Sequence, residues 1–163
     1  MIAFIDETPG SFEEALELAL SDRQPVCWRA TWIIKNYMEK DDIRVQPYVR
    51  DFVNILADKK EGHQRELLKI LMKMNLDDEY ISFLYDFCVK AWKEPKNQPS
   101  LRHTSIGFVL KCAKENPDFG HGISELSQAV YMDSLSAGIK RSVQTWFDKF
   151  LCETVATAAR NDP

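Results

Sequence analysis

The chain has 163 residues, of which 45% are hydrophobic and 28% charged, and its formal net charge is −4 at pH 7. This balance is typical of a globular protein with a sizeable core, and it excludes the disordered and fibrous classes. The chain contains no run of about 18 apolar residues, and its start, MIAFIDETPG, lacks a basic region, so we expect neither a membrane span nor a secretory signal.

Helical periodicity continues along the whole chain, whereas strand-like alternation between tight turns is nearly absent. The first predicted helix, over residues 11–20, opens with Ser11 and Glu14 in the spacing of a capping box. Three later helices are expected to begin at prolines that follow a glutamine, because proline is tolerated in the first helical turn: Pro25, Pro47 and Pro99. The sequence therefore predicts an all-helical protein.

The predicted helices pair into four consecutive hairpins. The hairpins cover residues 11–40, 47–74, 78–114 and 122–160, and their helices cover 11–20, 25–40, 47–58, 61–74, 78–92, 99–114, 122–133 and 136–160. Arg29, Arg65 and Arg102 recur in the second helices at intervals of about 37 residues, the length of one helical repeat. This period predicts a single helical-repeat domain over residues 1–163, built as a solenoid.

The apolar positions of the second helices provide a check on this repeat. Superposing them aligns three sets: Ala30, Ile33, Ile34 and Tyr37; Leu67, Ile70, Leu71 and Met74; and Ile106, Val109, Leu110 and Ala113. These sets are predicted to face the core. Their shifts differ slightly from the spacing of the arginines, so the equivalence of the three arginines is left open.

Several stretches resemble HEAT-like and armadillo-like repeats. QPVCWRATWIIKNY, HQRELLKILMKM and QPSLRHTSIGFVLKCAKENP are similar to second helices of such units, and FEEALELAL, YVRDFVNILAD and YISFLYDFCVKA are similar to first helices. The resemblance implies a right-handed α-α superhelix of about four antiparallel helix pairs, a HEAT-like solenoid. KEPKNQP and ENPDFGHG lengthen two turns, so we expect the last hairpin to be an atypical cap.

Charge is divided between the two helices of each hairpin. Every predicted first helix is net acidic and every predicted second helix is net basic. A basic face formed by the second helices would attract an acidic partner or a phosphate backbone. The alternative interpretation is that the charges attract the helices of each hairpin to one another or are simply solvated.

Two tryptophans, Trp28 and Trp32, lie four residues apart with Arg29 between them. If exposed, they would form an aromatic and basic platform suited to stacking on a base, a peptide side chain or a cation. If buried, they would pack against the neighbouring helices. The candidate partner-binding residues are Trp28, Arg29, Trp32, Arg65, Arg102 and His103.

We predict no catalytic residue, metal site or cofactor. The three histidines, His63, His103 and His121, lack metal-ligand spacing, and no phosphate-binding glycine loop is present. The four cysteines are scattered singly, which is typical of reduced, mostly buried thiols in a cytoplasmic protein: Cys27, Cys88, Cys112 and Cys152.

The favoured hypothesis is a cytoplasmic, non-catalytic scaffold that binds an unknown protein or peptide along the basic face of the second helices. The alternative is a nucleic-acid-binding module, or a diverged relative of the HEAT-like alkylpurine DNA glycosylases, in which a basic face with tryptophans and an acidic residue holds damaged DNA. Only Glu39 stands near the tryptophans as such an acid, so no catalytic role is transferred. We expect a monomer or weak self-association.

Overall fold

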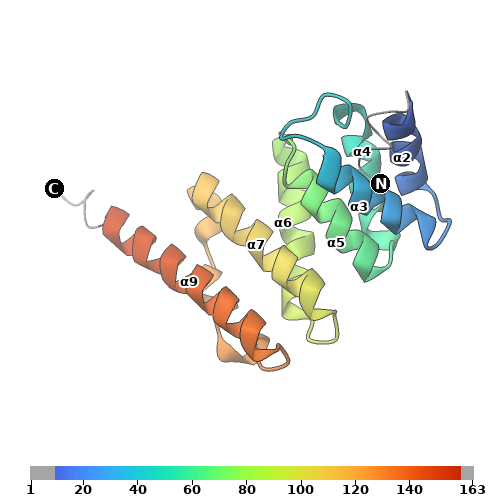
Figure 1. Ribbon diagram of the computed structural model, residues 1–163. Coiled ribbons are helices and arrows are strands. Elements are labelled where there is room, and N and C mark those ends of the chain that lie inside the picture. The colour runs from blue at the N-terminus through green and yellow to red at the C-terminus, as the bar shows by residue number, and fades with distance from the viewer. Residues whose placement is uncertain (1–9, 159–163) are drawn as a thin grey trace. The chain divides into compact units, whose positions relative to one another are not determined.

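The computed structural model describes residues 10–158 of the chain (Figure 1). Within this range the backbone forms helices joined by turns and loops and contains no strand, which confirms the predicted all-α class. The α-helices are α2 (Ser11–Leu20), α3 (Val26–Tyr37), α4 (Val49–Ile55), α5 (Glu61–Leu71), α6 (Asp78–Lys93), α7 (Pro99–Glu115), α8 (Ile123–Leu126) and α9 (Ala137–Ala158). Short 3-10 turns accompany them: η1 (Gln46–Tyr48), η2 (Leu56–Asp58), η3 (Pro117–Gly120) and η4 (Ala129–Tyr131).

Most predicted helix boundaries agree with the structure. The starts of α2, α5, α6 and α7 fall on the predicted residues, and α3 begins one residue after Pro25. The capping-box prediction is wrong, because α2 begins at Ser11 itself and Gly10 occupies the N-cap position. Gly10 has a φ of 83°, a left-handed conformation that glycine adopts easily, and it has no side chain with which to cap the start of the helix. The predicted end of the last helix, at residue 160, lies outside the described residues.

The chain divides into two compact units, residues 1–84 and 85–163, with the boundary inside α6. Each unit is described by itself below. The prediction of one continuous repeat domain over residues 1–163 concerns how the units join, and it stays a prediction, as does the handedness of a superhelix.

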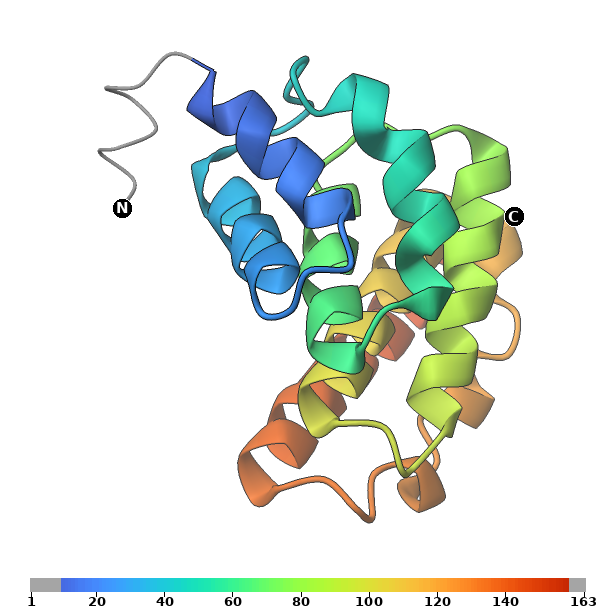
Figure 2. The same ribbon diagram turned by 90° about the vertical axis from the view of Figure 1, so that its right-hand side faces the viewer.

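In the first unit, the first helices of the two hairpins contact each other, and so do the second helices. α2 packs on α3 and α4 packs on α5, while α2 also contacts α4 and α3 also contacts α5. Figure 2 shows α3, in blue, beside α5, in green. This arrangement is the stacking that a helical-repeat pattern predicts. The shared core includes Phe12, Leu16, Ile34, Phe52 and Leu67.

Lysines from one hairpin bind the helix ends of the preceding hairpin in the first unit. Lys59 donates to the carbonyl oxygens of Leu20 and Ser21, at the end of α2. Lys73 donates to the carbonyl oxygens of Lys35, at 2.9 Å, and Met38, at 3.1 Å, at the end of α3. A positive charge at these carbonyls satisfies acceptors that have no partner inside the helix and interacts favourably with the helix dipole.

The second unit packs α7 against α9 and against the η3 turn. Trp92, the last large apolar residue of α6, is fully buried and lies against Phe147 of α9, with ring centroids 6.2 Å apart and ring planes tilted by 57°. The three sets of apolar positions predicted from the repeat are buried in both units, except Ile33 and Tyr37, which are half-buried. The periodicity of the second helices was therefore a correct guide to the core.

The predicted helix over residues 122–133 is replaced by two short pieces, α8 and η4. The chain becomes extended at Gln128, between them. Side chains take backbone acceptors of this segment: Trp92 Nε1 donates to the Leu126 carbonyl oxygen at 3.0 Å, and the Arg102 guanidinium donates to that of Tyr131. Because these carbonyls have partners outside a helix, the backbone can leave the helical path without burying an unpaired acceptor.

Candidate functional site

The exposed side of α3 carries three of the predicted contacts. Its opposite side is buried and consists of Cys27, Ala30, Thr31 and Ile34. Trp32 is 43% exposed, Trp28 is half-buried, and Arg29 is exposed without an ion-pair partner among the described residues. We call Trp28, Arg29 and Trp32 the α3 surface.

Arg65 of α5 shares a buried carboxylate with a second cation. Glu66 is 1% exposed, and its Oε1 atom accepts hydrogen bonds from Arg65 Nε, at 2.8 Å, and from Lys69 Nζ, at 3.0 Å. Glu66 Oε2 is buried and has no hydrogen-bond partner among the described residues. Arg65 keeps 28% of its side chain exposed. One buried acid thus holds two cations at the surface of α5, and the cluster has a net positive charge.

Two contacts show how α3 and α5 lie beside each other. Thr31 Oγ1 and His63 Nε2 are 2.9 Å apart, and Lys73 Nζ donates to the Lys35 carbonyl oxygen. Both residue numbers increase from the first contact to the second, so the two helices run in the same direction. The part of α5 between these contacts, which includes Arg65, therefore runs along the part of α3 that carries Trp32.

His63 is buried between these helices and is neutral. Thr31 Oγ1 lies 2.9 Å from the Cys27 carbonyl oxygen and 2.9 Å from His63 Nε2, so its hydroxyl joins the backbone of α3 to the imidazole of α5. His63 Nδ1 has no hydrogen-bond partner among the described residues. Burial, and secondarily the charge of Lys59, lower the pKa of His63 to about 4. This histidine is a structural link between α3 and α5.

Arg102 belongs to the interior of the second unit. It is 0% exposed, and its guanidinium donates to the carbonyl oxygens of Trp92 and Tyr131 and to Ser134 Oγ. It also lies 5.0 Å from the centroid of the Trp92 ring. We therefore correct the interpretation of Arg102 as a partner contact: all its donor groups face the protein's own backbone and side chains.

His103, the neighbour of Arg102, lies at the contact between α7 and α9. It is half-buried, with Nε2 3.2 Å from Ser142 Oγ and its ring centroid 4.4 Å from that of Trp146.

The six candidate partner-binding residues are divided between the two units. Trp28, Arg29, Trp32 and Arg65 belong to the first unit, and Arg102 and His103 to the second.

The three regularly spaced arginines occupy different environments. Arg29 is exposed, Arg65 binds a buried acid, and Arg102 is fully enclosed. Equal spacing along the sequence thus does not give the arginines a common role, because exposure depends on which elements cover each helix.

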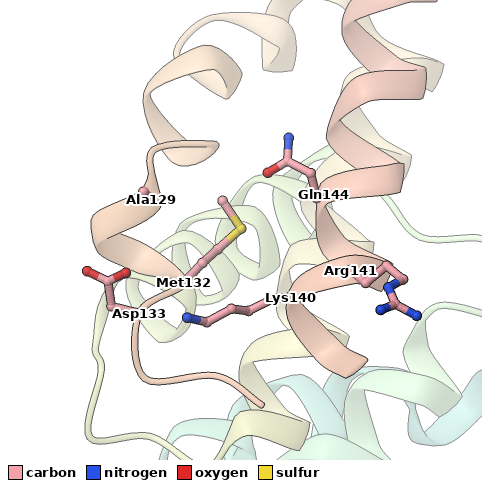
Figure 3. A pocket seen from close by; sticks show the side chains of 6 residues that line it. All are labelled: Ala129, Met132, Asp133, Lys140, Arg141 and Gln144. Carbon is pink, nitrogen blue, oxygen red and sulfur yellow. The ribbon is translucent and has the colours of Figure 1, made fainter. Parts of the chain in front are cut away.

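A cleft in the second unit was not predicted. It measures about 340 Å³ and lies between η4 and the first turns of α9 (Figure 3). Its lining residues are Ala129, Met132, Asp133, Lys140, Arg141 and Gln144. In Figure 3 the side chains of Met132 and Lys140 reach into the space between the two elements, whereas Arg141 points away from it. The long link ENPDFGHG was the sequence signal that this last hairpin is irregular.

The thiols and acids of the described residues form no reactive cluster. All four cysteines are unpaired, and three are buried. Burial raises the pKa of Cys112 to about 11, so this thiol stays protonated at neutral pH. Within residues 10–158, no three His, Cys, Asp or Glu side chains are placed to hold a metal ion.

Comparison with known families identifies the fold family of the chain. A family model described as a HEAT repeat domain matches residues 1–149. No curated protein and no solved structure matches the chain. No described helix is long and apolar enough to cross a membrane.

Proposed function

Because the chain belongs to the HEAT repeat domain family, we propose that it is a scaffold without catalytic activity that binds a protein or peptide through the α3 surface and the neighbouring part of α5. Helical-repeat proteins present extended surfaces formed by equivalent helices, and these surfaces recognise partners without special catalytic residues.

The single observation that carries this proposal is the exposure of Trp32. A tryptophan that is 43% exposed leaves a large apolar ring in contact with water, although this residue type is usually well covered. Tryptophan and arginine are also the residue types that most often dominate binding energy at protein interfaces. On the α3 surface both types lie on one helix, at Trp32 and Arg29.

The charge around Trp32 favours an acidic partner. α3 contains Arg29 and Lys35 and no acidic residue, and α5 adds the cations Arg65 and Lys69 around a single buried acid. Opposite charge on a partner would speed association and set its orientation. The proposal also places the protein in the cytoplasm, where its unpaired cysteines would stay reduced.

Selection from a displayed peptide library, with the full chain as bait, tests the proposal. We expect enriched peptides to combine acidic and apolar residues. Their affinity should fall about tenfold or more in Trp32→Ala and in Arg29→Ala, as expected for interface anchors. Arg50→Ala is the matched control, since Arg50 is exposed on α4, a first helix of the first unit. Equal binding by all three variants would overturn the proposal.

A second candidate is nucleic-acid binding, and it is favoured by the same pair of residues. An exposed tryptophan next to an arginine suits stacking on a base and contact with a phosphate. Single-stranded and duplex DNA should be titrated at low and moderate salt while tryptophan fluorescence is followed. Saturable, salt-sensitive quenching that is lost in Trp32→Phe would favour this candidate. If the protein were a DNA glycosylase, Glu39 would have to supply the acidic residue of the site. Glu39 lies exposed after the end of α3.

A further inference from the structure

The cleft of the second unit exists because the segment before α9 is not a regular helix. α8 and η4 are separated by an extended residue, Gln128, and the chain then turns into α9. Met132 forms the buried side of the resulting space, while Ala129 and Val130 lie exposed beside it, Val130 at 63%. The cleft therefore has an apolar wall, to which Ala129 and Met132 contribute.

Lys140 in this cleft lacks the ion pair that comparable lysines have. Among the described residues of the second unit, the half-buried lysines are Lys93, Lys111 and Lys140. Lys93 pairs with Glu125 at 2.9 Å, and Lys111 lies 3.9 Å from Glu115. Lys140 has no ion-pair partner among the described residues, although it reaches into the cleft. An ammonium group that has no counter-charge within the protein favours a carboxylate supplied from outside.

Asp133 is the acidic residue of the lining, and in Figure 3 its carboxylate points away from the space between η4 and α9, whereas Gln144 suits a peptide backbone. Gln144 Nε2 donates to Asp148 Oδ1 at 2.8 Å, which leaves the side-chain carbonyl oxygen of Gln144 to accept a hydrogen bond from a peptide N–H. The unbranched Met132 side chain adapts its shape to an apolar neighbour. A volume of about 340 Å³ is at the lower end of the range of ligand sites, about 300 to 1,000 Å³.

We propose that the cleft between η4 and α9 binds an acidic, extended peptide segment of a partner protein, with a carboxylate on Lys140 and an apolar side chain on Met132. The cleft is open to solvent, so a chain can lie in it and continue on both sides. The inference rests on the proposed function only in assuming that the protein binds peptides. Its residues are separate from those of the α3 surface.

Fluorescence polarisation with the full chain tests this site. The probe is a fluorescein-labelled peptide in which glutamate alternates with leucine, and the matched probe has glutamine in place of glutamate. We expect saturable binding of the glutamate probe, at least about tenfold weaker binding in Lys140→Glu, and a change of less than about twofold in Lys90→Glu. Lys90 is exposed on α6 and has no ion-pair partner among the described residues. Circular dichroism would show that both variants keep their helices.

Backbone amide shifts in an NMR titration locate the probe. Changes concentrated at residues 129–144 support the cleft. Two results of the binding assay would overturn it: no saturable binding of the glutamate probe, or equal affinity for the glutamine probe. A third is displacement of the glutamate probe by free N-acetylglutamate at a concentration equal to that of the probe, which would indicate a small-molecule site. The variant Trp32→Ala separates the two proposals. Loss of binding in Trp32→Ala but not in Lys140→Glu would support the α3 surface and overturn the cleft.

Discussion

Arg102 is a charged residue that serves the interior of the protein. Its guanidinium donates to two carbonyl oxygens and one hydroxyl and lies beside the Trp92 ring. Lysine carries the same charge but not the planar arrangement of donors, so the substitution leaves buried acceptors unpaired. We expect Arg102→Lys to lower the free energy of unfolding by about 2 to 4 kcal/mol, measured by urea denaturation. Arg29→Lys, at an exposed site, should change it by less than about 0.5 kcal/mol.

The buried neutral His63 makes stability depend on pH. Its pKa is about 4 in the folded protein and about 6.5 in the unfolded chain, so between these values the unfolded chain binds a proton that the folded protein does not. The stabilisation present above pH 6.5 is therefore lost as the pH falls towards 4, by up to about 3 kcal/mol.

Denaturation of His63→Gln at several pH values between 7 and 4 measures this contribution. Glutamine keeps an amide group that can hydrogen-bond to Thr31 but does not titrate, so the variant should lose less stability on acidification than the wild type. The matched control is His121→Gln, at an exposed position, which should retain the wild-type slope. A wild-type slope in His63→Gln would contradict the assignment.

The residue scale is also where the sequence was least informative. Trp32 and Trp28 were left open between core and surface, and the structure gives an intermediate answer, with Trp32 43% exposed and Trp28 half-buried. Arg102 could not be recognised as buried, because its acceptors come from residues about 30 positions away in the sequence or from the preceding helix. Such environments depend on tertiary contacts that periodicity does not encode.

At the scale of elements, local signals were sufficient for most helices. Pro99 begins α7 as predicted, and apolar positions such as Leu67 and Val109 are buried, because helix starts and helix faces follow from nearby residues. The prediction of a helix over 122–133 was wrong because of contacts with residues far away in the sequence. Trp92 and Arg102, from other helices, bind carbonyl oxygens of that segment. The cleft beside Met132 was missed for the same reason.

The contact of Lys73 with the end of α3 gives a prediction for this scale. Lys73→Met keeps the aliphatic part of the side chain but removes the donor to the Lys35 and Met38 carbonyl oxygens. We expect the free energy of unfolding to fall by about 1 to 2 kcal/mol. Lys40→Met, at an exposed position, is the control and should have little effect. Equal stability of the two variants would show that this helix end needs no capping lysine.

At the scale of the whole molecule, the division of charge leads to an expectation about assembly. The sequence predicts a monomer or weak self-association. Acidic first helices of one molecule attract basic second helices of another only where the two surfaces come into contact, and salt screens this attraction. Light scattering should give a mass close to 18.9 kDa at moderate ionic strength, with any increase limited to low salt and high concentration. A dimer that persists at high salt would contradict this expectation.

The hydrogen bonds that hold residues 126–134 in place have a consequence for how the ligand specificity of the protein can change. Trp92 and Arg102 hold the segment chiefly by main-chain oxygens, those of Leu126 and Tyr131, which every amino acid provides. The exposed residues between these anchors, Gln128, Ala129 and Val130, could therefore be exchanged without loss of attachment. The proposed peptide-binding cleft, which this segment borders, can then change its preferred ligand while the framework that supports it remains the same.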